Sequence, residues 1–115
     1  MTATEKNLLL DRLSVCYNRT NYLKIVCEET KALDEAAQFD RRKARLRIEI
    51  DGLLRDLYHN WIGDAKALKE MLDVSNRALD KCIKNIEADT KTADNIVKAI
   101  GYIDNIIKVT VDLVA

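Results

Sequence analysis

The ten residues LYHNWIGDAK, positions 57–66, gather the side chains of this chain that are best suited to chemistry. They include its only histidine, its only tryptophan and one of its three glycines. Histidine exchanges protons near neutral pH, so His59 is the first candidate for a catalytic group. One histidine cannot form a catalytic triad by itself, however, and no serine or cysteine lies in a nucleophile-elbow context. We therefore expect no enzymatic activity.

The same stretch has the pattern of a connection between two helices. Gly63 can adopt the left-handed conformation that commonly ends a helix, Asn60 tolerates a turn, and Asp64 can cap the helix that follows. Trp61 and Ile62 would then fold over the open end of a bundle. This interpretation predicts a helix-to-helix turn near residues 59–64.

The spacing of His59 and Gly63, within LLRDLYHNWIGDAKAL, resembles the phosphate-accepting motif of histidine phosphotransfer domains. That family usually has a lysine just before the glycine, where this chain has Ile62. The resemblance covers about a dozen residues and implies a four-helix bundle with an exposed phosphoacceptor, His59, on a helix. A phosphorelay protein is therefore the alternative function.

The sequence predicts no metal or cofactor. A di-iron bundle needs Glu-x-x-His pairs on facing helices, which one histidine cannot provide. Cys16, Cys27 and Cys82 are odd in number and form no CxxC motif. They fit reduced, buried thiols better than a disulfide framework or a zinc site.

The composition indicates one all-α domain spanning residues 1–115. Hydrophobic residues make up 48% and charged residues 33%, proline is absent, and the abundant residues favour long helices. The formal net charge is zero, so nucleic acid is an unexpected partner, and the basic run at 41–47 is interpreted as solvated. No basic leader or membrane-spanning apolar run is present, which predicts a cytoplasmic protein.

Apolar residues recur with spacings of three and four over the second half of the chain, a heptad pattern. The positions of this stripe are Ala65, Leu68, Leu72, Ser75, Leu79, Cys82, Ile86, Asp89, Ala93, Ile96, Ile100, Ile103, Ile107, Thr110 and Val114. Further apolar residues, among them Ala99, Ile106 and Val97, flank it on both sides. A stripe this wide predicts contact with two neighbouring helices, as in an antiparallel up-and-down bundle.

The first half has the same periodicity, and two topologies remain open. Thr2 followed by Glu5 predicts a capping box at the first helix, and the heptad phase slips near residue 31. Breaks near 31 and 89, together with the turn near 59–64, would give four helices in one chain. If only the central turn is real, two long helical hairpins would pair in a dimer, with Asp89 inside the stripe.

We expect a non-enzymatic protein-interaction or assembly module that acts through helix-face packing. It would bind a protein partner and self-associate, most simply as a homo-dimer. The candidate interface residues are Met71, Tyr102, Ile106, Val109 and Leu113. A small all-helical enzyme that binds an anionic metabolite through arginine or lysine is a third alternative.

Overall fold

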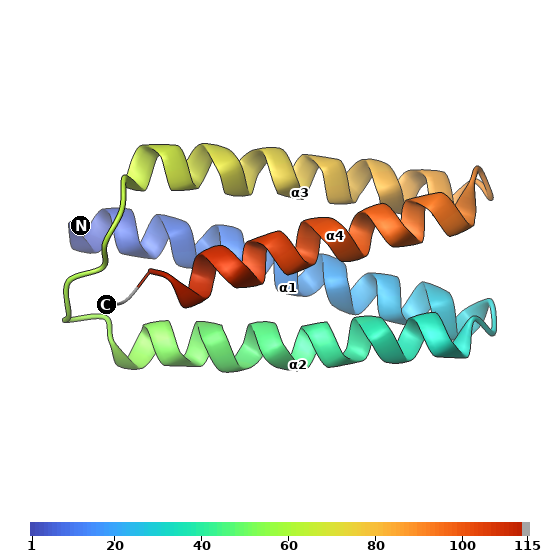
Figure 1. Ribbon diagram of the computed structural model, residues 1–115, viewed down its shortest axis with the longest axis horizontal. Coiled ribbons are helices and arrows are strands. Elements are labelled where there is room, and N and C mark those ends of the chain that lie inside the picture. Colours follow the sequence, from blue (N-terminus) through green and yellow to red (C-terminus); the bar gives the residue numbers. More distant parts are fainter. Residues whose placement is uncertain (114–115) are drawn as a thin grey trace.

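A computed structural model shows four helices that run alternately up and down one long axis (Figure 1). They are α1 (Ala3–Glu29), α2 (Leu33–Arg55), α3 (Ala65–Glu87) and α4 (Thr92–Val111). The structure describes residues 1–113, so Val114 of the predicted stripe lies outside the described residues. The molecule measures 43 × 22 × 17 Å. The all-α bundle is confirmed, and of the two topologies the chain adopts the one with four helices.

The bundle consists of two helical hairpins, α1 with α2 and α3 with α4. The helix α1 packs beside α3 and α2 packs beside α4, so residues 56–64 must cross the end of the bundle diagonally (Figure 1). The two short turns, near residues 30–32 and 88–91, lie together at one end, which we call the turn end. The diagonal segment, the start of α1 and the end of α4 lie at the other, which we call the crossover end.

Local hydrogen bonds from side chains explain where α1 and α3 begin. The predicted capping box is confirmed at α1, where the Thr2 hydroxyl accepts from the Glu5 amide and the Glu5 carboxylate accepts from the Thr2 amide. The Asp64 carboxylate accepts from the amides of Lys66 and Ala67 and so caps α3. Both caps satisfy amides that have no partner inside the helix.

Two turns of the same type end α1 and α3. The amide of Ala32 donates to the carbonyl of Cys27, and the amide of Thr90 donates to that of Asn85, each at 2.8 Å. The residues just before these donors, Lys31 and Asp89, have left-handed φ values of 62° and 52°. These are Schellman motifs, in which glycine is the usual left-handed residue. Asp89 is therefore an exposed turn residue, and its predicted place inside the apolar stripe is wrong.

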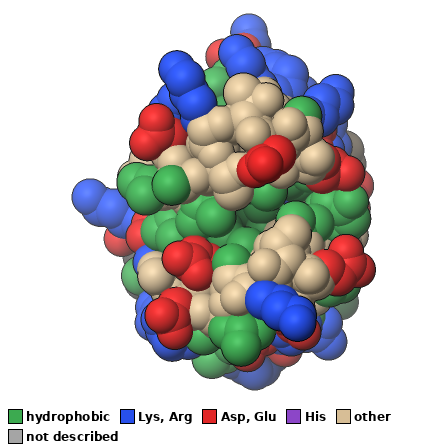
Figure 2. Space-filling model, turned by 90° about the vertical axis from the view of Figure 1, so that its right-hand side faces the viewer, with side chains coloured by type: hydrophobic (Ala, Val, Ile, Leu, Met, Phe, Trp, Pro, Cys, Tyr) green, Lys and Arg blue, Asp and Glu red, His purple; other side chains and the backbone are tan. Residues whose placement is uncertain are grey.

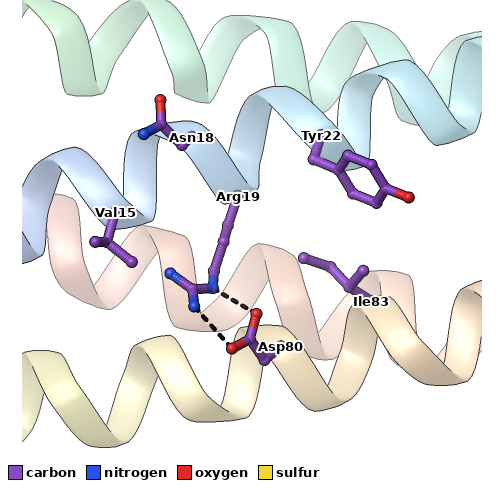
Figure 3. Close-up of a pocket in the computed structure, with 6 residues that line it drawn as sticks. All are labelled: Val15, Asn18, Arg19, Tyr22, Asp80 and Ile83. Carbon is purple, nitrogen blue, oxygen red and sulfur yellow. Dashed lines mark hydrogen bonds and ion pairs between the residues drawn. The ribbon is translucent and has the colours of Figure 1, made fainter.

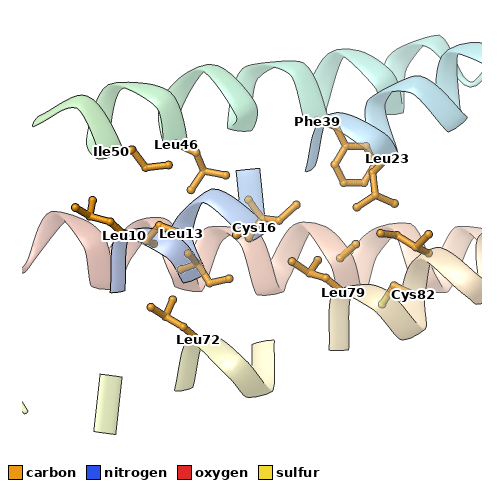
Figure 4. Packing of buried hydrophobic residues seen from close by; sticks show 14 of the residues in the cluster. Leu10, Leu13, Cys16, Leu23, Phe39, Leu46, Ile50, Leu72, Leu79 and Cys82 are labelled. Carbon is orange, nitrogen blue, oxygen red and sulfur yellow. The ribbon is translucent and has the colours of Figure 1, made fainter. Parts of the chain in front are cut away.

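The core runs along the axis between the four helices (Figure 4). Its fully buried large side chains include Phe39, six leucines and two isoleucines. Thr20 and Thr110 are also buried, and each hydroxyl donates 2.8 Å to the carbonyl four residues earlier, which makes these polar groups compatible with the core.

The helix α4 is rotated relative to the predicted stripe. Ile96, Ile103 and Thr110 are buried as expected, but Ala99 and Ile106 fill the positions between them, while Ile100 and Ile107 are only partly buried. The turn at residues 88–91 restarts the helix, so the heptad phase of α3 does not carry through to α4. Packing against two neighbours decides which edge of the broad stripe turns inward.

No helix within residues 1–113 has the length and apolar character needed to cross a membrane.

Candidate functional site

His59 lies in the diagonal segment, after α2 has ended at Arg55. Its side chain is exposed, with Nδ1 3.5 Å from a carboxylate oxygen of Asp56. Gly63, at a φ of 106°, is also in this segment. The resemblance to phosphotransfer domains implies that His59 lies on the exposed face of a helix. In the structure His59 is exposed, but it lies between α2 and α3 and not on a helix. What the residues around His59 show instead is a tightly held connection.

Lys6 of α1 holds the diagonal segment to the bundle. Its ammonium group donates to the carbonyls of Leu57, at 2.7 Å, and of His59. The same group lies 5.6 Å from the centre of the Trp61 ring, within range of a cation–π interaction. Lys6 is only 6% exposed, so these carbonyls replace the water that its charge would otherwise attract. The sequence signal was its spacing of three from Leu9, on the core stripe of α1.

Trp61 closes the crossover end. Its side chain is buried against the core, and its indole N–H donates 3.0 Å to the carbonyl of Asp56. The next amide, of Ile62, donates 2.8 Å to the carbonyl of Leu113 near the end of the chain. The stretch 57–66 therefore closes this end of the core and contacts three other segments: α1, the end of α2 and the end of α4.

The three cysteines are buried and free, as the sequence predicts. Burial raises the pKa of the Cys16 thiol to about 12 and raises the pKa values of the Cys27 and Cys82 thiols as well. Such thiols are poor nucleophiles because the thiolate is the reactive form. Within residues 1–113, no three His, Cys, Asp or Glu side chains are grouped so that they could hold a metal ion.

A shallow groove between α1 and α3 contains an ion pair (Figure 3). The Arg19 guanidinium donates 2.5 and 2.7 Å to the two carboxylate oxygens of Asp80, and Val15, Tyr22 and Ile83 flank the pair. Because Asp80 already occupies this guanidinium, the groove offers no free arginine to an anionic metabolite. The ion pair between Arg19 and Asp80 therefore links α1 to α3.

A second groove of about 360 Å³ lies between α2 and α4 and is predominantly apolar. We call it the α2–α4 groove, and its lining residues are Glu35, Gln38, Ala93, Ile96, Val97 and Ile100. Helices α2 and α4 pack less extensively than the two helices of either hairpin. Val97 is 70% exposed and Leu33, at the start of α2, is 65% exposed. In the view onto the turn end, apolar side chains form a band between the two turns (Figure 2).

The predicted interface residues do not form this groove. Ile106 and Leu113 are buried in the core, so the chain's own helices already cover them, and their predicted role in an exposed interface is wrong. Met71, Tyr102 and Val109 are partly buried. The prediction failed because it placed Ile106 beside a stripe centred on Ile107, whereas the rotation of α4 brings Ile106 inward. The available signal for the groove was Val97, an apolar residue on the flank of that stripe.

Comparison with known proteins adds no relative to this description: no protein-family model matches the sequence, and neither curated proteins nor solved structures show significant similarity to it.

Proposed function

We propose that this chain is a non-enzymatic protein-interaction module that binds its partner by helix-face packing in the α2–α4 groove. The observation that carries the proposal is the exposure of Val97 in a groove that the buried Ile96 and the partly buried Ile100 also line. Scattered apolar residues on a surface need no explanation, but apolar residues that line a groove indicate a binding surface.

The energetics of the groove fit a modest interaction. Complete burial of one valine or leucine side chain contributes about 1.5–3 kcal/mol. Val97 would supply only part of this, because its side chain is already partly covered. Helix-in-groove binding uses anchors of this kind, spaced three or four residues apart on the partner.

Self-association remains a prediction, and the solution mass tests it. Light scattering coupled to size exclusion separates a monomer of 13.1 kDa from a dimer. If the groove mediates self-association, Val97→Gln should shift the equilibrium toward monomer. Val74→Gln is the matched control, since Val74 is a 56% exposed valine on α3, outside the groove. Equal effects of the two substitutions would contradict self-association through the groove.

A further inference from the structure

We propose that the α2–α4 groove binds a lysine- or arginine-rich amphipathic helix of another protein. This inference rests on the proposed function and adds the chemistry of the partner to it. It combines the apolar floor of the groove with the distribution of charge around the turn end.

Charge is distributed unequally along a chain that is neutral as a whole. The turn end, taken as residues 27–37 and 85–95, has seven carboxylates and two lysines. The crossover end, taken as residues 1–8, 55–66 and 108–113, has four acidic and four basic side chains. Figure 2 shows acidic side chains around the apolar band of the turn end. An excess of one sign at one end attracts partners of the opposite charge.

Helix stability explains only part of this acidic excess. Asp34 and Asp94 lie in the first turns of α2 and α4, where a negative charge interacts favourably with the helix dipole. Glu28 and Glu29, by contrast, lie in the last turn of α1, which has no basic residue there. Glu87 ends α3, where Lys84 lies in the same turn and the Glu87 carboxylate accepts a 3.0 Å hydrogen bond from the Tyr22 hydroxyl. Glu28 lies 3.6 Å from Lys24, so both it and Glu87 have partners within the bundle. Even with Lys24 counted, the turn end keeps more carboxylates than cations.

The groove itself offers apolar contact and a carboxylate, with no free cation in its lining. Ala93, Val97 and Ile100 provide the contact surface, and Glu35 is its charged lining residue. Beyond the groove, Arg42 is neutralised by Asp104, to which it donates at 2.8 and 3.2 Å.

The length of the groove limits what can fill it. The α4 residues that line it, Ala93 to Ile100, span about 10 Å at a rise of 1.5 Å per residue. Two apolar side chains at positions i and i+4 of a docked helix are about 6 Å apart and fit this span. Lysine or arginine residues beside those anchors would lie close to Glu35, at the turn end of the bundle.

A second copy of the chain fits this surface poorly. A two-fold dimer places the same patch of both subunits face to face. A two-fold axis through the α2–α4 groove would therefore bring two acidic turn ends close together, and like charges across an interface are unfavourable. A basic partner removes this repulsion.

The test uses three synthetic amphipathic helices of about 18 residues, long enough for stable helix formation. They share the same leucine positions and differ only in having lysine, glutamine or glutamate on the polar face. Binding to the full chain is measured by isothermal titration calorimetry. The lysine peptide should bind about tenfold more tightly than the glutamine peptide, and the glutamate peptide should bind most weakly. Added salt should reduce the difference.

Substitutions locate the site and its charge. Val97→Gln should weaken binding of the lysine and glutamine peptides alike, whereas its control Val74→Gln should change neither. Glu35→Gln should weaken binding of the lysine peptide only. Glu70→Gln is its control, an exposed glutamate of α3 outside the groove. Circular dichroism of each variant checks that the helices remain folded.

The possible results separate the two proposals. Equal binding of the lysine and glutamine peptides, still lost in Val97→Gln, would overturn the preference for a basic partner and leave the groove as an interaction site. Binding that Val97→Gln and Val74→Gln reduce equally would overturn the location. If no peptide binds and Val97→Gln does not change the solution mass, the proposed function itself fails.

Discussion

The ammonium group of Lys6 lies 2.7 Å from the carbonyl oxygen of Leu57, a residue 51 positions further along the chain. This contact joins the first turns of α1 to the segment that follows α2. Carbonyl groups just beyond the end of a helix carry a partial negative charge, which the lysine offsets. Lysine is normally found at the surface, but Lys6 can be buried because its ammonium group binds the carbonyls of the diagonal segment.

Removal of this contact should destabilise the protein. Lys6→Met keeps the aliphatic stem but loses the charged hydrogen bonds, and we expect the free energy of unfolding to fall by about 2 kcal/mol. Urea unfolding followed by Trp61 fluorescence measures this, since Trp61 lies against the lysine. The exposed Lys66→Met is the control and should change stability by less than about 0.5 kcal/mol. Equal effects of the two would contradict the assigned role of Lys6.

Glycine should stabilise the left-handed positions of the two turns. Lys31→Gly and Asp89→Gly relieve the strain of a side chain at φ values of 62° and 52°, and each should raise the free energy of unfolding by about 1 kcal/mol. Lys84→Gly, inside α3, is the control and should lower it by a similar amount, because glycine is unfavourable within a helix. Thermal unfolding measures all three. Asp89→Gly also removes the acceptor of the Thr92 hydroxyl, so a loss of stability in Lys31→Gly is the result that would argue against the Schellman motif.

The ion pair between Arg19 and Asp80 should contribute only at pH values where Asp80 is ionised. The hydrogen bond from Arg19 lowers the pKa of the Asp80 carboxyl below 3.8. A carboxyl with a lowered pKa stabilises the folded state above its unfolded pKa, and this contribution is lost as the pH falls through the folded pKa. Because both groups are partly solvated, the contribution is about 0.5–1 kcal/mol.

The comparison of the protein with Asp80→Asn tests this pH dependence. The difference in unfolding free energy should be present at about pH 7 and should shrink at about pH 2. Added salt at the higher pH should also reduce it. A difference independent of pH would mean that packing, and not the ion pair, is responsible.

The thiols should react only when the bundle opens. All three cysteines are buried, and a raised pKa keeps them protonated near neutral pH. An Ellman's assay at about pH 8 should therefore show little reaction in buffer and three thiols in denaturant. Cys16→Ser and Cys82→Ser identify which thiol reacts first in partial denaturation. Rapid reaction of Cys16 in native conditions would contradict its position in the core.

The features that depend on contacts between residues close in sequence were predicted correctly. The capping box of Thr2 and Glu5 depends on a spacing of three, and the buried threonines and cysteines follow from a helical period of 3.6 residues. The helical content and the bundle class are properties of this kind. They follow from periodicity and composition, which a sequence displays directly.

Periodicity and composition could not predict the left-handed turn at Asp89 or the rotation of α4. The apolar pattern continues across residue 89, and either Ile106 or Ile107 satisfies it equally well. Contacts of α4 with both α3 and α2 make the choice and bury Ile106. Ile106, one of the predicted interface residues, is buried for this reason, since one step along a helix turns a side chain by about 100°.

The sequence by itself determined the all-α class, the capped start of α1 and the burial of the cysteines, because each depends on spacings of three or four residues. Tertiary structure alone decided the diagonal crossing, the burial of Lys6 and the groove between α2 and α4. Each of these arises where residues more than 50 positions apart meet, and no local pattern records which of them will share a surface.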